Sequence, residues 1–65
     1  MHYVIEDRNG NTLNHYYKFE SNLSGFDLVF PCYSDAYEYI ELTLTDRAAS
    51  EALNDRLYVI LEVLA

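Results

Sequence analysis

Apolar and polar residues alternate on both sides of a turn-forming segment near the start of the chain. Residues 2–7 and 12–20 have the period of two that is typical of strands, and they flank Arg8-Asn9-Gly10-Asn11. The odd-numbered positions predict one shared face, made of Tyr3, Ile5, Leu13, His15, Tyr17 and Phe19. Because facing residues of a ladder share a face, this pairing requires a three-residue loop, Asn9 to Asn11. We expect the positive φ of that loop at Gly10 or Asn11.

A loop and one further strand follow the predicted hairpin. Residues 21–25 (Ser-Asn-Leu-Ser-Gly) have the composition of a loop. A strand is predicted over residues 26–30, with Phe26, Leu28 and Phe30 on one side, and Pro31 should end it.

Residues 37–45 fit both a strand and a helix. As a strand, the segment would turn Ile40, Leu42 and Leu44 inward and Tyr39, Glu41, Thr43 and Thr45 outward. The helical alternative depends on two other periodicities. Acidic residues recur every three positions, at Asp35, Glu38 and Glu41, and apolar residues recur every four positions, at Ala36, Ile40 and Leu44. The β-branched ending Thr-Leu-Thr favours the strand.

The last segment has helical spacing. Thr45 or Asp46 is the expected N-cap, and the apolar positions that follow are Ala49, Ala52, Leu53, Leu57, Ile60, Leu61 and Leu64. The opposite side carries Arg47, Glu51, Asp55, Tyr58 and Glu62, with Arg47 and Glu51 spaced for an i,i+4 pair. The alternative is a break at Asn54-Asp55 followed by a strand from Leu57 to Val63. We favour the helix.

Together these elements predict an α+β fold in a single domain, residues 1–65. Its sheet would be small and antiparallel, with about four strands and an N-terminal hairpin, and a C-terminal helix would cover one face of that sheet.

Charge is distributed unevenly along the chain. Eleven acidic and four basic residues give a net charge of −7. Residues 1–18 are neutral, whereas residues 19–65 hold nine acids against Arg47 and Arg56. Because such a charge repels phosphate, we expect no direct binding to nucleic acid or to an anionic membrane.

Other features of the composition point to a cytoplasmic protein. The longest apolar run, Leu57 to Leu61, is too short to span a bilayer, and no secretory signal is expected. A single cysteine, Cys32, excludes an internal disulfide and fits a reducing compartment.

Catalytic and metal-binding motifs are not evident in the sequence. His2, His15 and Cys32 lack the spacing of metal ligands. Asp35, close to Cys32, would make its thiol a poor nucleophile. Paired carboxylates could serve a minimal hydrolase, but a chain this short has little volume for the cleft that this chemistry needs. We therefore expect no enzyme activity, no metal and no cofactor.

Acidic residues interleaved with tyrosines form the candidate binding surface. Carboxylates two apart on a strand or four apart on a helix are separated by roughly 6 Å, close to the scale of a phosphate row. Tyrosines among them would offer flat faces to arginine. The candidate partner-binding residues are Asp35, Tyr37, Glu38, Tyr39, Glu41, Asp46, Glu51, Asp55, Tyr58 and Glu62. The competing interpretation is an ordinary solvated face with tyrosines in packing roles.

The stretch Asp35-Ala-Tyr-Glu-Tyr-Ile-Glu41, the acidic segment around Glu51 and Asp55, and the small size resemble phage-encoded DNA-mimic inhibitors. In particular, they resemble anti-CRISPR proteins that occupy the DNA path of a type I Cascade complex. The resemblance implies an inhibitor without enzyme activity that acts in the host bacterial cell. Its partner would be a basic, nucleic-acid-binding protein or complex such as Cascade.

We expect a monomer rather than a dimer. The alternative function is a homodimeric or antitoxin-like interaction module that uses the apolar run from Leu57 to Leu61 together with Val63.

Overall fold

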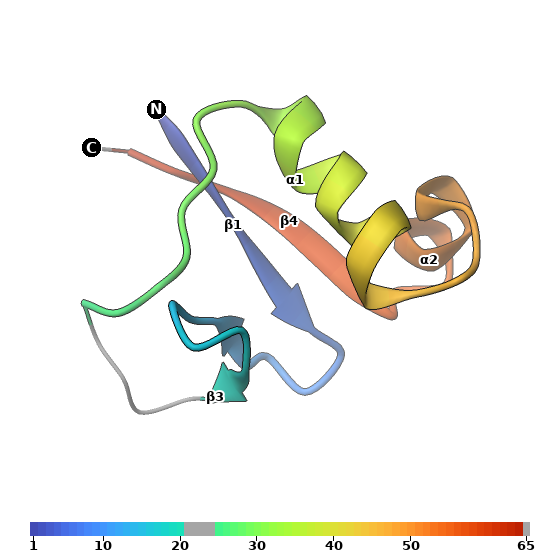
Figure 1. Cartoon of the computed structure of the whole chain (residues 1–65), viewed down its shortest axis with the longest axis horizontal. Coiled ribbons are helices and arrows are strands. Elements are labelled where there is room, and N and C mark those ends of the chain that lie inside the picture. The colour runs from blue at the N-terminus through green and yellow to red at the C-terminus, as the bar shows by residue number, and fades with distance from the viewer. Residues whose placement is uncertain (21–24, 65) are drawn as a thin grey trace.

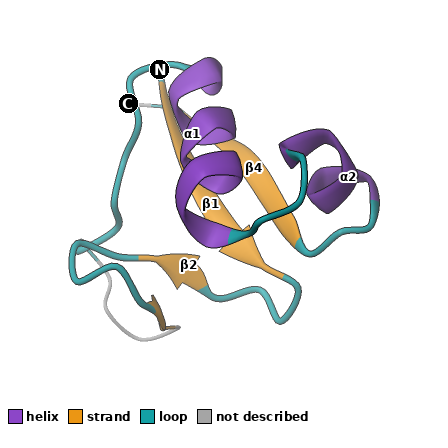
Figure 2. Cartoon of the chain, turned by 45° about the vertical axis from the view of Figure 1, so that its right-hand side comes forward, coloured by secondary structure: helices purple, strands orange, loops and turns teal. Residues whose placement is uncertain are grey.

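The computed structural model describes residues 1–20 and 25–64 (Figure 1). The elements follow one another as β1 (His2–Asp7), β2 (Thr12–Leu13), β3 (Phe19–Glu20), α1 (Tyr33–Tyr39), η1 (Ile40–Leu44), α2 (Ala49–Asn54) and β4 (Tyr58–Val63). The strands form one antiparallel sheet in the order β3-β2-β1-β4. Figures 1 and 2 show α1 crossing over β1 and β4, with α2 beside the start of β4. The predicted α+β class and four-stranded sheet are confirmed.

The N-terminal hairpin has the predicted pairing parity. Glu6 lies opposite Thr12, so positions of equal parity face each other. The backbone N–H of Asp7 donates to the Asn11 carbonyl (2.9 Å), which leaves a three-residue loop from Arg8 to Gly10. That loop begins one residue earlier than predicted. Its positive φ falls on Gly10 (+82°), as expected.

The predicted strand over residues 12–20 is wrong, because a tight turn interrupts it. The backbone N–H of Asn14 donates to the Lys18 carbonyl (2.9 Å), and Tyr17 adopts a left-handed φ of 62°. The chain therefore reverses within these residues and pairs β2 with β3, Leu13 opposite Phe19. As a result Tyr17 is exposed, as is His15, instead of sharing a face with the buried Leu13.

Residues 26–30 form single bridges instead of a regular strand. Phe30 exchanges two backbone hydrogen bonds with Tyr3 (2.8 and 2.9 Å), and Asp27 bridges to Asn14. Phe30 is buried and Leu28 half-buried, as predicted, but Phe26 is exposed. The loop predicted at residues 21–25 lies, except for Gly25, outside the described residues.

The strand predicted over residues 37–45 is also wrong, and the helical alternative holds. Helix α1 continues directly into η1, a wider π-helical stretch in which the Thr45 N–H donates to the Ile40 carbonyl (3.2 Å). The four-residue repeat supplies the buried stripe, because Ala36 and Ile40 have no exposed surface. A strand would have buried Leu42, whose side chain is instead 73% exposed.

The predicted long C-terminal helix is wrong, and the alternative, a break at Asn54-Asp55 followed by a strand, is correct. Helix α2 begins after Ala48, not after Thr45 or Asp46, and ends at Asn54. Arg56 turns the chain with a φ of 59°. Strand β4 then pairs with β1 along its whole length, from Asp7↔Tyr58 to His2↔Val63. The strand prevails over the helix because β1 would otherwise lack a partner on this side.

The core lies between the sheet and the helices. Its buried members are Ile5, Leu13, Phe30, Ala36, Ile40, Ala49 and Ala52. Alternation along β4 turns Tyr58 and Ile60 toward this core. Among the described residues, no helix is both long and apolar enough to cross a membrane.

Candidate protein-binding surface

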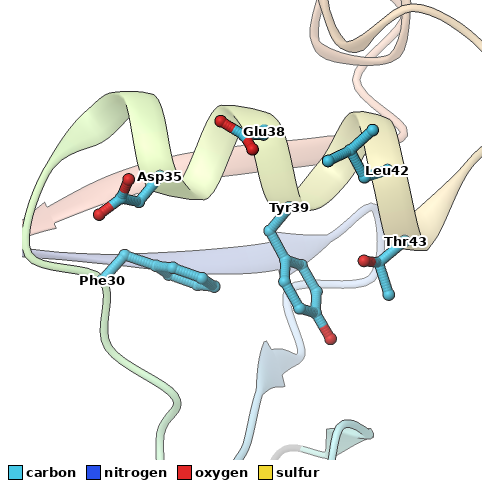
Figure 3. Close-up of a pocket in the computed structure, with 6 residues that line it drawn as sticks. All are labelled: Phe30, Asp35, Glu38, Tyr39, Leu42 and Thr43. Atoms are coloured by element: carbon cyan, nitrogen blue, oxygen red, sulfur yellow. The ribbon is translucent and has the colours of Figure 1, made fainter.

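An acidic hollow runs along one side of the helix formed by α1 and η1. Asp35 and Glu38 are exposed and stand one turn apart, at a spacing that places neighbouring side chains on one helical surface. They border a hollow of about 390 Å³ (Figure 3). We define the acidic face as the six residues that line it: Phe30, Asp35, Glu38, Tyr39, Leu42 and Thr43.

Apolar groups lie beside these carboxylates. The rings of Phe30 and Tyr39 are 5.4 Å apart between centroids and tilted by 55°. Figure 3 shows both rings beneath the helix, with Asp35, Glu38 and Leu42 spread along it. Neither carboxylate has a basic partner among the ion pairs of residues 1–20 and 25–64. The acidic face can therefore take an arginine or lysine, with the charged head at the carboxylates and the apolar stem against Leu42.

Burial affects the Tyr39 hydroxyl group at this site. The pKa of Tyr39 is raised above its ordinary 10.0, first because burial penalises the phenolate and second because of the Tyr17 phenol. At neutral pH the hydroxyl is protonated and can donate a hydrogen bond. It adds no negative charge to the acidic face.

Glu41 does not extend the acidic row. Its Oε1 accepts a hydrogen bond from the backbone N–H of Ala49 (3.2 Å), at the first residue of α2. The side chain therefore caps that helix, which has no capping side chain of its own at Ala48. No sequence signal marks this role, because the two residues are eight positions apart and the cap depends on the turn between η1 and α2.

Arg47 neutralises half of the negative charge of the two acids in and just after α2. The Arg47 guanidinium donates to Glu51 (Nε–Oε2 3.4 Å) and to Asp55 through its Nη2. These hydrogen bonds, the one to Asp55 first and the one to Glu51 second, raise the pKa of Arg47 above its ordinary value. The predicted Arg47–Glu51 pair is confirmed. The cluster presents one net negative charge instead of two.

The predicted row of Glu51, Asp55 and Glu62 on one helix is wrong. Glu62 lies in β4 opposite Tyr3, so it does not share an element with the other two. Asp46 is exposed in the connection between η1 and α2. The structure therefore brings Asp35, Glu38 and Tyr39 together on the acidic face and holds Glu51 and Asp55 together around Arg47. The other candidates lie outside both groups.

Two of the tyrosines proposed as surface anchors are packing residues. The Tyr58 ring stacks on Phe19 at 5.6 Å, and its hydroxyl donates to the Leu44 carbonyl (3.4 Å). Tyr37 is half-buried, with its ring 6.3 Å from that of Tyr33. The competing interpretation of these tyrosines, as packing residues, is the correct one for both.

Sequence reasoning missed the apolar members of the acidic face. Leu42 follows Asp35 and Glu38 at positions i+7 and i+4, so the helical alternative contained the signal. The strand prediction turned Leu42 inward and concealed it. Phe30 could not be found in this way, because it reaches the helix through the bridge to Tyr3.

Within the described ranges, no three His, Cys, Asp or Glu side chains gather closely enough to hold a metal ion. Comparison with known proteins identifies no relative. No family model matches the chain, no curated protein matches its sequence, and no solved structure matches its fold.

Proposed function

We propose that the protein is a non-catalytic inhibitor whose acidic face occupies a Lys/Arg-rich, nucleic-acid-binding groove of another protein and thereby excludes DNA. A type I Cascade complex in a phage-infected bacterial cell is the target that the resemblance to anti-CRISPR proteins suggests. The observation that carries the proposal is the pair Asp35 and Glu38, exposed beside an aromatic hollow and outside every ion pair that the described part of the chain forms.

Charge on the rest of the chain supports this binding mode. The net charge of −7 steers the protein toward a basic surface at long range. At short range, the acidic face supplies two carboxylates on one helical side, which can contact two adjacent basic side chains as phosphates do. The apolar groups around Leu42 add contact area that DNA does not offer, so an inhibitor could outcompete it.

A competition experiment tests the proposal. A labelled target duplex is bound to a purified, guide-loaded type I Cascade complex, and the protein is titrated while fluorescence anisotropy reports the bound DNA. The wild-type chain should displace the duplex. The double variant Asp35→Asn/Glu38→Gln should need about tenfold more protein, which corresponds to ~1.4 kcal/mol for the two contacts. Displacement should also weaken as salt rises.

The matched control removes the same charge elsewhere. Asp46→Asn/Glu20→Gln changes two exposed acids outside the acidic face and leaves Glu20 able to accept its hydrogen bond from Asn14. This control should displace DNA as the wild type does. The proposal fails if the wild type displaces no DNA from such complexes, or if both double variants lose activity equally.

A further inference from the structure

Strand β4 has an open outer edge. The sheet order places β4 at one end, with β1 as its neighbour. Tyr3 and Asp7 use their backbone groups on the other side of β1, toward Phe30 and Asn11. Because bonding direction alternates along a strand, Val59 and Leu61 bond to β1. The N–H and C=O groups of Tyr58, Ile60 and Glu62 therefore point outward.

The edge of β4 lacks the sequence features that usually prevent an edge strand from pairing with a strand of another molecule. It is six residues long and contains no proline and one charged residue, Glu62. On the face away from the helices, Val59, Leu61 and Val63 are 37–40% exposed. A long, apolar edge with unpaired backbone groups is a template for another strand.

Space is available beside the edge on the helix side as well. A hollow of about 400 Å³ adjoins Tyr58, Val59 and Ile60. Its other walls are the start of α1, the end of α2 and the side chain of Arg56, a residue outside the ion pairs of the described residues. An added strand could therefore place its inward side chains there without displacing a helix.

We propose that β4 pairs antiparallel with β4 of a second copy of this chain, in a register centred on Ile60 opposite Ile60 of the second copy. The two four-stranded sheets then become one continuous sheet of eight strands. Tyr58 lies opposite Glu62 of the second copy, and the symmetry of the pair makes the reverse contact identical. The exposed valine and leucine side chains of both copies join into one apolar strip. This inference replaces the expectation of a monomer.

Opposite charges at the two ends of β4 favour a second copy of this chain as the partner, and they favour this register of the two strands. The Arg56 side chain lines the hollow beside Tyr58 and Ile60. Glu62 of the second copy, opposite Tyr58 in this register, projects to the same side of the sheet, within reach of that long side chain. The two-fold axis generates this ion pair twice. A register centred on Glu62 would instead place two carboxylates opposite each other. Residues 56–64 carry no net charge, so this edge is where two chains of charge −7 can approach.

The size of the contact predicts a weak dimer. A stable interface at the lower end of the range buries about 600 Å² per partner. That area is roughly one-seventh of the 4418 Å² surface of this chain. A contact made of one strand pair and one apolar strip is small for a stable dimer, so we expect a dissociation constant on the order of micromolar.

Charge-reversal variants test the partner and the register together. Sedimentation velocity over a range of protein concentrations should show a monomer–dimer equilibrium for the wild type. Arg56→Glu and Glu62→Arg should each raise the dissociation constant about tenfold, because each places like charges at both contacts. An equimolar mixture of the two variants should form a heterodimer, visible by native mass spectrometry, because mixing restores opposite charges at both contacts.

Two further variants control for folding and for charge. Glu62→Pro removes an outward N–H without touching the ladder to β1, so it should abolish the dimer while far-UV circular dichroism stays unchanged. Glu38→Arg changes the charge equally on the acidic face and should not form the preferred heterodimer with Arg56→Glu. The inference is overturned if the wild type is monomeric at every concentration, or if the two edge variants show no preference for each other.

Discussion

The turn between β2 and β3 depends on one buried side chain, Asn14. It is 1% exposed, and its Oδ1 accepts hydrogen bonds from the backbone N–H of Tyr16 (2.9 Å) and of Lys18 (3.2 Å). Its Nδ2 donates to Glu20 Oε1 (3.4 Å). Replacing Asn14 by alanine removes all three bonds and leaves two backbone donors in the turn without their acceptor.

The expected cost follows from these contacts. At about 1 kcal/mol for each hydrogen bond, Asn14→Ala should lower the free energy of unfolding by ~2–3 kcal/mol. A domain of this length has ~3–10 kcal/mol in total, so the loss is large. Asn14→Asp keeps both acceptor bonds but places a second carboxylate against Glu20. It should cost about 1 kcal/mol at neutral pH.

Urea unfolding followed by far-UV circular dichroism measures these differences. Adding Glu20→Gln to Asn14→Asp should recover most of the loss at neutral pH, because the amide can donate to the new carboxylate. Equal destabilisation by the alanine and aspartate variants would refute the assignment of Asn14 Oδ1 as the acceptor that holds the turn. A loss below 0.5 kcal/mol for Asn14→Ala, against the ~2–3 expected, would refute it as well.

Single residues elsewhere in the chain give three more expected outcomes. Glu41→Ala should lower stability by about 1 kcal/mol because it removes the cap on Ala49, whereas Glu41→Gln should retain most of it; both changes should leave DNA displacement unaltered. Tyr17→Gly should raise stability by about 0.5–1 kcal/mol in thermal unfolding, because glycine adopts the φ of 62° without the cost that an L-residue bears. Stability should fall as the pH rises above 10.0, because the unfolded Tyr39 loses its proton before the folded one does, and Tyr39→Phe should reduce that fall.

The sequence pattern predicted the structure correctly where the conformation depends only on residues that are close together in the chain. The loop after β1 depends on a glycine with positive φ and on pairing parity, and both are visible in the sequence. The turn at Asn14 is different, because it depends on a buried amide that bonds to residues two and four positions later. In the sequence, the same stretch shows a good strand alternation.

Two segments have a sequence pattern that fits both a helix and a strand. For these segments, the structure that forms depends on the element against which each one packs. Residues 37–45 contain both a strand face and a four-residue repeat, and the sheet selects the repeat that buries Ala36 and Ile40. Residues 58–63 pair with β1, which a helix could not do. Each alternative was apparent from the sequence, but the choice required knowledge of what each segment packs against.

The candidate site was predicted in part for the same reason. Asp35, Glu38 and Tyr39 share the acidic face because they lie on one helix. The capping role of Glu41 and the partial neutralisation of Asp55 depend on the approach of α2 and the position of Arg47. Net charge predicts the sign of a binding partner, while only the fold shows which acids would be open to such a partner.

The exposed Asp35 and Glu38 on α1 have no basic partner among the described residues, whereas Arg47 pairs with Glu51 and Asp55. Titrating the isotope-labelled chain with an arginine-rich peptide, and following backbone amide shifts by NMR, distinguishes these two groups of acids. If the acidic face is the binding surface, we expect salt-sensitive shifts centred on Asp35, Glu38 and Leu42. Shifts centred on Glu51 and Asp55, or spread evenly over all acidic residues, would show that binding does not depend on the acidic face.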